Sequence, residues 1–150
     1  MSLVPRTVPK GMITPTSLPK APTPVGKLGG KRVLVLEDDP TLRHLLVHAL
    51  GSEYAVYEAS DGLAGLQLLR QIAVPDLIVC DVMMPHIDGF AFARRIRERR
   101  ALARVPLIFL TAKTDAPSIV EGINAGARHY IPKPFKIEDL MDRAKQLLPT

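Results

Sequence analysis

The chain has 150 residues, of which 47% are hydrophobic, and a formal net charge of +5 at pH 7. This size suits one compact domain with its own core, and no run approaches the roughly 18 apolar residues that span a bilayer. The N-terminus lacks the continuous apolar segment of a signal peptide, and the single cysteine, Cys80, excludes an internal disulfide. We therefore expect a cytoplasmic protein.

Residues 1–30 differ in composition from the rest of the chain. They hold four basic residues, no acidic ones and six of the 14 prolines, without amphipathic periodicity. Such a segment cannot bury enough apolar surface to offset its chain entropy, so we expect a flexible, proline-rich, basic tail. An inert linker is the favoured interpretation, and a weak electrostatic tether to an acidic partner is the alternative. Residues 31–150 carry 16 basic and 15 acidic residues, so their charge does not indicate nucleic-acid binding.

Short apolar runs alternate with longer segments of helical periodicity after residue 30. The first run, Val33–Leu36, predicts a buried strand, and Pro40 then begins a helix that ends at Gly51. This helix carries a stripe of apolar residues: Leu42, Leu45, Leu46, Ala49 and Leu50. Tyr54–Glu58 is less apolar and predicts a strand near a sheet edge.

The middle of the chain repeats this alternation. Ser60 is the expected N-cap of a helix that continues to Ile72 and is ended by Pro75. Asp76–Cys80 predicts a third strand, and a third helix is expected from about Phe90 to Arg100.

Two further strands and two further helices complete the pattern. Leu107–Leu110 predicts a buried strand, and the apolar residues within Ile119–Ile123 predict a helix that stops at Gly126. A short strand, Arg128–Ile131, follows. The last helix places six apolar residues on one face: Ile137, Leu140, Met141, Ala144, Leu147 and Leu148.

Five apolar strands in strict alternation with five helices predict a single α/β domain over residues 31–150. Its fold is expected to be a doubly wound, five-stranded parallel sheet with helices on both faces. Ligands bind to such sheets at the carboxyl ends of the strands, where the strand order reverses. Polar residues follow four of the strands at this edge: Glu37-Asp38-Asp39, Asp81, Thr111 and Lys133.

Three of these residues, Glu37, Asp38 and Asp81, would bring carboxylates into one small space. Like charges at short distance repel strongly, so protonation or a cation must relieve them. The ligands are all oxygens, with no cluster of histidine and cysteine, which favours magnesium over zinc. Magnesium prefers one or two carboxylates and a phosphate, so the site has room for a phosphoryl group.

Lys133 and Thr111 would add a positive charge and a hydroxyl to the same edge. Both groups can stabilise the oxygens of a phosphoryl group. Asp81 is then the natural nucleophile, because carboxylates can form aspartyl-phosphates.

Five motifs, in this order, resemble the receiver domain of two-component response regulators. They are Val35-Leu36-Glu37-Asp38-Asp39-Pro40, Asp81-Val82-Met83-Met84-Pro85 with Asp88-Gly89, Leu110-Thr111-Ala112, Ala125-Gly126-Ala127 and Lys133-Pro134-Phe135. The resemblance covers residues 31–150 and implies a flavodoxin-like fold with the strand order 2-1-3-4-5. It also implies that Asp81 is the phosphoacceptor. Magnesium would be bound by Asp38 and Asp81, by Glu37 through water, and by the backbone carbonyl of Met83.

The resemblance also implies a switch. Thr111 would be its hydroxyl, Tyr130 its aromatic residue, and Lys133, joined to Pro134 by a cis peptide bond, would bind the phosphoryl group. Phosphorylation would alter the surface formed by the fourth helix, the fifth strand and the fifth helix.

The implied function is that of a signalling switch that assists its own phosphorylation and dephosphorylation and is not otherwise an enzyme. The phosphoryl group would come from a sensor histidine kinase or a histidine phosphotransfer protein. The altered surface would meet an output domain, another protein or a second copy of the chain, without direct binding to nucleic acid or membrane. The native chain either ends near Thr150 or continues into an output segment.

Two other functions are open to such a chain. One is a receiver-like module that binds partners without phosphorylation, although such modules usually lack an acid or the lysine, and here Asp38, Asp81 and Lys133 are all present. The other is a phosphohydrolase that forms an aspartyl-phosphate. That chemistry normally needs Asp-x-Asp after the first strand, whereas Asp81 follows the third and its second neighbour is Met83.

Other polar residues have structural explanations. Asp39, Asp61-Gly62 and Asp88-Gly89 are expected at helix starts and turns. His44 and His48 are four residues apart on one helix but have no third ligand, which indicates a helix surface.

The arginine-rich segment 94–100 is predicted to be a solvated helix surface. Its five arginines point in nearly every direction around the helix, whereas a groove-binding helix gathers them on one face.

Overall fold

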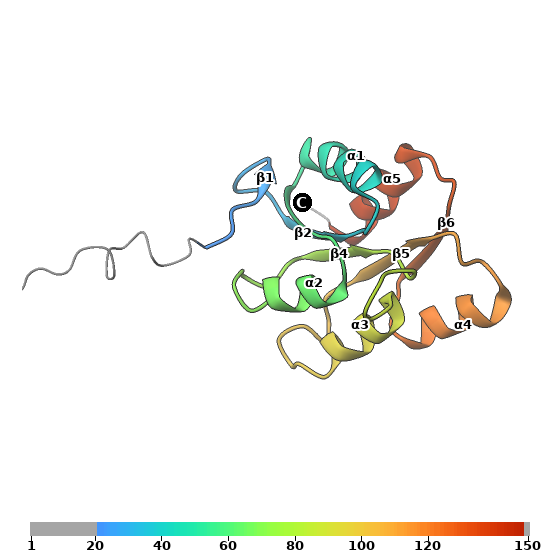
Figure 1. Ribbon diagram of the computed structural model, residues 1–150. Coiled ribbons are helices and arrows are strands. Elements are labelled where there is room, and N and C mark those ends of the chain that lie inside the picture. Colours follow the sequence, from blue (N-terminus) through green and yellow to red (C-terminus); the bar gives the residue numbers. More distant parts are fainter. Residues whose placement is uncertain (1–20, 149–150) are drawn as a thin grey trace, which may run out of the picture.

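A computed structural model describes residues 21–148 of the chain. Six strands and five helices follow one another along these residues (Figure 1). In chain order they are β1 (Val25–Gly26), β2 (Arg32–Leu36), α1 (Pro40–Gly51), β3 (Ala55–Ala59), α2 (Gly62–Leu68), β4 (Leu77–Cys80), α3 (Gly89–Arg97), β5 (Leu107–Thr111), α4 (Ala116–Asn124), β6 (His129–Pro132) and α5 (Ile137–Leu147). None of the helices within residues 21–148 is long and apolar enough to cross a membrane.

The strands form one sheet in the order β1-β3-β2-β4-β5-β6. From β3 to β6 every neighbouring pair is parallel, and Val35 in β2 lies opposite both Glu58 and Val79. This confirms the predicted α/β fold and the order of its five parallel strands. The chain passes from β2 to β3 on one side and then to β4 on the other. The strand order therefore reverses between β2 and β4, where ligands bind in this class of sheet.

Helices cover both faces of the sheet, with α1 and α5 on one face and α2, α3 and α4 on the other (Figure 1). Successive residues of β2 point to opposite faces, as they do in any strand. Val33 and Val35 belong to the core beneath α1 and α5, and Leu34 and Leu36 to the core that holds Phe92 of α3. Both faces are thus buried, and this holds the carboxyl ends of the strands in a fixed relation.

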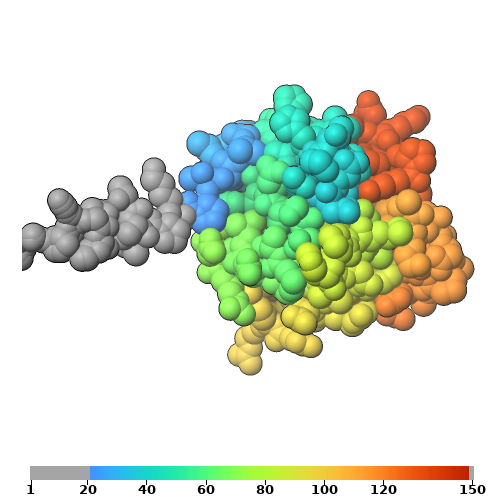
Figure 2. Space-filling model, in the orientation of Figure 1, coloured from blue at the N-terminus to red at the C-terminus, as the bar shows by residue number. Residues whose placement is uncertain are grey.

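The sheet has a sixth strand, β1, that was not predicted from the sequence. It pairs antiparallel with β3, and the amide of Lys27 just after it donates to the carbonyl of Tyr54 at 3.0 Å. Figure 2 shows this segment packed beside α1. A two-residue strand is too short to show an alternation of apolar and polar residues, so it could not be predicted from the sequence. Residues 21–30, predicted as part of a flexible tail, therefore contain a strand, and residues 1–20 lie outside the described part of the chain.

The predicted N-cap of α2 at Ser60 is wrong. The cap is Asp61, whose Oδ1 accepts a hydrogen bond from the amide of Ala64 at 2.8 Å. The helix then ends at Leu68 and does not reach Ile72. Ile72 still packs against the core from the turn that follows, which explains why an apolar period continues beyond the helix.

The other predicted helix starts are confirmed. Asp39 and Asp88 cap α1 and α3 and accept hydrogen bonds from first-turn amides at 3.0 and 2.8 Å. α3 ends at Arg97, however, and does not extend to the predicted Arg100. Beyond it the backbone turns, and Leu102 is buried with 1% exposure.

Candidate functional site

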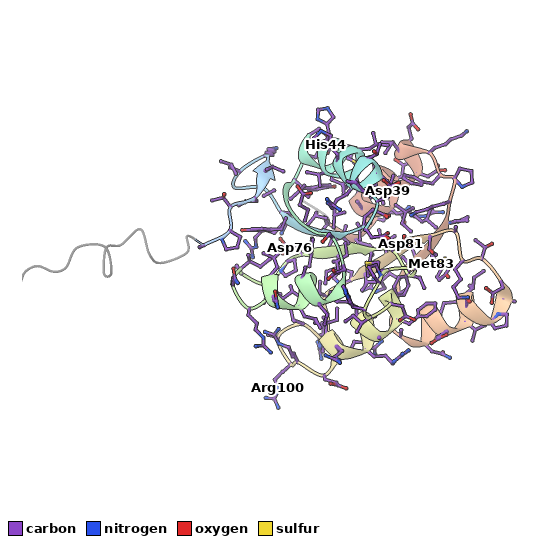
Figure 3. The ribbon with its side chains drawn as sticks, viewed as in Figure 1. Asp39, His44, Asp76, Asp81, Met83 and Arg100 are labelled. Atoms are coloured by element: carbon purple, nitrogen blue, oxygen red, sulfur yellow. The ribbon has the colours of Figure 1, made fainter. Side chains whose placement is uncertain are left out.

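Three carboxylates meet at the carboxyl ends of β2 and β4. Glu37 and Asp38 directly follow β2, and Asp81 directly follows β4. One oxygen from each lies within 4.8 Å of the others. Glu37 and Asp81 are only 1% and 6% exposed, whereas Asp38 is exposed. Figure 3 shows Asp81 beside Met83 at this edge, with Asp76 toward the opposite end of β4.

Lys133 joins two of the three carboxylates. It follows β6, and its Nζ donates to Oε1 of Glu37 at 2.9 Å and to Oδ2 of Asp81 at 3.0 Å. Residues from three different strand ends therefore form one hydrogen-bonded cluster. A buried carboxylate pair needs such a partner, because an unpaired buried charge is strongly destabilising.

Burial and neighbouring charges shift the pKa values of Glu37 and Lys133 within the cluster. Burial raises the pKa of Glu37, and the nearby charge of Asp81 adds to the rise, although hydrogen bonds from Lys133 and the Asp39 amide partly offset it. Burial alone would lower the pKa of Lys133. Its hydrogen bonds to the two carboxylates, with their negative charges, outweigh burial and raise that pKa. The carboxylates thus favour the charged form of the lysine.

The loop after Asp81 folds tightly back onto the start of α3. Oδ1 of Asp81 accepts from the amide of Met83 at 3.2 Å, and the amide of Gly89 donates to the carbonyl of Val82 at 2.8 Å. A Cβ on Gly89 would lie 2.3 Å from the backbone oxygen of Asp81. Gly89 therefore permits a close approach that fixes the position of the Asp81 backbone, which is more than the turn that the sequence predicted.

Thr111 and Tyr130 are connected through the backbone of Lys113. Oγ1 of Thr111 accepts from the Lys113 amide at 3.2 Å, and the hydroxyl of Tyr130 donates to the Lys113 carbonyl. Thr111 is fully buried at the end of β5, and the ring of Tyr130 packs on Phe109 with centroids 5.9 Å apart. The two residues predicted to form a switch thus both hydrogen-bond to the backbone of Lys113.

The remaining predicted positions of the site are also placed by the structure. Met83 lies in the loop after Asp81 with 58% of its surface exposed. The peptide bond between Lys133 and Pro134 is cis, as the resemblance to receiver domains implied. The predicted metal and phosphoryl ligands therefore lie at one edge of the sheet or in the loops that follow it, whereas Tyr130 lies within β6.

The histidines and the arginines of segment 94–100 take no part in the hydrogen bonds of this cluster. His44 and His48 are exposed on α1, and no third ligand joins them within residues 21–148, where the carboxylates are the one group suited to a metal. The arginines of segment 94–100 are exposed, and Figure 3 shows Arg100 projecting from the molecule. His86, in the loop between β4 and α3, has a φ of 73°, and its Nδ1 lies 3.5 Å from Oδ2 of Asp61.

Arg43 is a contact of the site that the sequence did not indicate. Its Nη1 donates to the backbone carbonyl of Glu37 at 2.8 Å, and its Nε donates to Oε1 of Glu58 at 3.1 Å. A bond from a side chain to a backbone atom leaves no pattern in the sequence, so no signal pointed to it.

Comparison with known proteins agrees with this architecture. Residues 33–145 match the family model of the response regulator receiver domain. The chain belongs to this family. The match spans nearly all of the five parallel strands and the five helices, so the receiver domain makes up most of the described residues.

Relatives of this receiver domain occur in regulators and in a kinase. It is 36% identical over 118 residues to the DNA-binding dual master transcriptional regulator RpaA of Synechocystis, covering 78% of this chain and 48% of the relative. It is 34% identical over 134 residues to the sensor histidine kinase TmoS of Ectopseudomonas mendocina, covering 89% and 14%. The chain thus spans about half the length of the regulator and a small part of the kinase.

Solved structures show the same fold. A putative response regulator from Chloroflexus aurantiacus superposes with a TM-score of 0.74 at 34% identity, covering 81% of this chain and 99% of the other. The chemotaxis response regulator CheY4 of Vibrio cholerae gives a TM-score of 0.73 at 32% identity, covering 79% and 99%. In both comparisons the match covers nearly the whole of the other chain, so both proteins share the fold of this receiver domain.

Proposed function

We propose that this receiver domain accepts a phosphoryl group on Asp81 from the phosphohistidine of a sensor histidine kinase or a histidine phosphotransfer protein. The observation that carries the proposal is the contact of Lys133 with both Glu37 and Asp81 at the strand ends. A buried carboxylate with a cation beside it is a nucleophile whose product charge can be stabilised in place.

In the transfer, a carboxylate oxygen of Asp81 forms a bond to phosphorus while the bond from phosphorus to the histidine nitrogen breaks. The electron pair of the broken bond stays on that nitrogen. Lys133 then stabilises the phosphoryl oxygens in place of the free carboxylate, and the hydroxyl of Thr111 donates to them. The new contacts of Lys133 and Thr111 with the phosphoryl oxygens would start the conformational change of the switch.

The donor set fits magnesium. Asp38 and Asp81 would bind it directly, with Glu37 acting through water and the Met83 carbonyl completing the protein ligands. The carboxylates lie close enough for one ion, and all the ligands are oxygens. Magnesium, when bound, offsets the negative charges of the carboxylates and of the phosphoryl group.

The output surface would be α4, β6 and α5. Val120 and Ile123, three residues apart on α4, are 55% and 59% exposed, so they form neighbouring apolar side chains on the helix surface. Tyr130 of β6 lies beneath this helix, so movement of Thr111 and Tyr130 would alter the surface. An output domain, a partner protein or a second copy of the chain would bind here, in a cytoplasmic setting.

The test is incubation with magnesium and acetyl phosphate, followed by intact mass. We expect the mass of one added phosphoryl group on the wild type and none on Asp81→Asn, which keeps the size of the side chain. An unmodified wild type, or equal labelling of the variant, would contradict the proposal and favour a module that acts without phosphorylation.

A further inference from the structure

Arg43 connects the acidic loop to the neighbouring strand. It lies in α1, and its side chain is only 21% exposed. One guanidinium nitrogen, Nη1, donates to the carbonyl of Glu37 at 2.8 Å, and Nε donates to Glu58 of β3 at 3.1 Å. The planar guanidinium can serve two acceptors in fixed directions, which a single ammonium cannot do.

These bonds restrain the backbone on both sides of Glu37. The amide of Glu37 donates to the carbonyl of Ala59 at the end of β3, and its carbonyl accepts from Arg43. The peptide that leads into Asp38 is therefore held to β3. The carboxylate of Asp38, by contrast, is exposed and accepts no hydrogen bond within the described residues. The position of this carboxylate is thus set by the backbone that precedes it.

We propose that Arg43 is a positioning residue for the magnesium site, acting through the Glu37 carbonyl to orient Asp38. This inference rests on the proposed function, because it takes the three carboxylates to be the metal site. Arg43 does not bind the metal or the phosphoryl group. It holds the loop so that Asp38 meets Asp81 without a further cost of ordering when the ion binds.

A role of Arg43 through its charge and a role through positioning predict opposite changes in magnesium affinity when Arg43 is replaced by a neutral residue. A positive charge near the site repels a divalent cation. If Arg43 acted only through its charge, the wild-type protein would therefore bind magnesium less tightly than a variant with a neutral residue at this position. A positioning arginine gives the reverse order. The sign of the change in magnesium affinity therefore separates the two roles.

The experiment measures the dissociation constant for magnesium by calorimetry in wild type, Arg43→Met, Arg43→Lys and Arg94→Met. We expect about tenfold weaker binding in Arg43→Met, a loss typical of residues that orient metal ligands. Arg43→Lys keeps the charge but not the fork, and its affinity should be intermediate. Arg94→Met removes an equal charge from a pair 3.2 Å apart between α3 and α4, and should stay within about twofold of the wild type.

A second measurement needs no metal. Amide hydrogen exchange at Asp38 and Asp39 in magnesium-free protein should be faster in Arg43→Lys and Arg43→Met than in wild type or Arg94→Met. Should Arg43→Met not fold, Arg43→Lys decides the question alone. Wild-type or tighter magnesium binding in the Arg43 variants overturns the inference. A wild type that binds no magnesium instead overturns the proposed function.

Discussion

The ammonium of Lys133 lies 3.0 Å from Oδ2 of Asp81. The same nitrogen donates to Glu37, so one cation pairs with two carboxylates that are almost fully buried and offsets only part of their charge. On the proposed function, a phosphoryl group on Asp81 and a magnesium ion would each change the hydrogen bonds of Lys133 to these carboxylates.

Replacing Lys133 by methionine should destabilise the magnesium-free protein by about 3 kcal/mol, because two buried carboxylates lose their partner. Added magnesium should restore more stability to the variant than to the wild type, since the carboxylates no longer have an ammonium beside them. Urea unfolding with and without magnesium measures both effects. Lys136→Met is the matched control: it removes an equal charge from the exposed start of α5 and should change little. A variant as stable as the wild type would contradict the prediction.

Thr111→Val should separate phosphorylation from the response of the surface. Valine has the same shape but cannot donate to a phosphoryl oxygen, and Thr111 hydrogen-bonds to the backbone of Lys113. We expect Asp81 to be labelled by acetyl phosphate, while the methyl NMR signals of Val120 and Ile123 shift less than in wild type. Thr114→Val, at an exposed position, should respond as the wild type does. Full shifts in Thr111→Val would exclude the hydroxyl from the switch.

His129 should make stability depend on pH. Burial lowers its pKa in the folded protein, and the charges of Arg143 and Arg128 lower it further. The unfolded chain therefore binds a proton at higher pH than the folded one. The resulting contribution is present above the unfolded pKa and is lost as pH falls from about 6.5 through the folded value.

We expect His129→Gln to lose less stability than the wild type between pH 7.5 and 5.5, measured by urea unfolding at each pH. Arg143→Gln should give an intermediate result, because burial is the larger cause and remains. Equal losses in wild type and His129→Gln would show that His129 does not contribute.

The positions of the site residues were predictable because each follows a strand whose apolar run marks its end. Asp81 after β4 and Thr111 in the last position of β5 follow directly from that pattern. Ser60 and Asp61 were both expected at the start of α2, and the sequence does not decide between them as the cap, because both residue types cap helices and they are adjacent. Side-chain contacts with distant backbone, such as that of Arg43 with Glu37, depend on packing between elements and have no local signature.

The exposure of α4 is a further result that the sequence could not give. Its apolar residues have helical spacing, which normally indicates a buried face, yet Val120 and Ile123 lie mostly in solvent. The face toward the sheet instead carries Ser118 and Gly122, which are small and buried. The missing side chain of Gly122 allows the helix to lie close to Tyr130.

Gly122 and Tyr130 give the last prediction. A Cβ on Gly122 would lie 2.7 and 2.8 Å from two ring carbons of Tyr130, and 3.2 Å from Phe109. Alanine in a helix is favoured over glycine by about 1 kcal/mol, but here the ring must move to admit the methyl group. Because the ring is only partly buried, we expect Gly122→Ala to displace it and to break the hydrogen bond from its hydroxyl to Lys113.

A double-mutant cycle isolates this contact. In a Tyr130→Ala background, Gly122→Ala should stabilise the protein by at most about 1 kcal/mol, since helix preference is then opposed only by the 3.2 Å approach to Phe109. In the Tyr130 background the same change should be neutral or destabilising, and the difference is the coupling between helix and ring. Burial raises the pKa of Tyr130, so displacement should also lower that pKa, which ring NMR signals can follow with pH. Equal effects of Gly122→Ala in both backgrounds would mean that α4 can shift without moving Tyr130, and the proposed path from Thr111 to the α4 surface would lose its support.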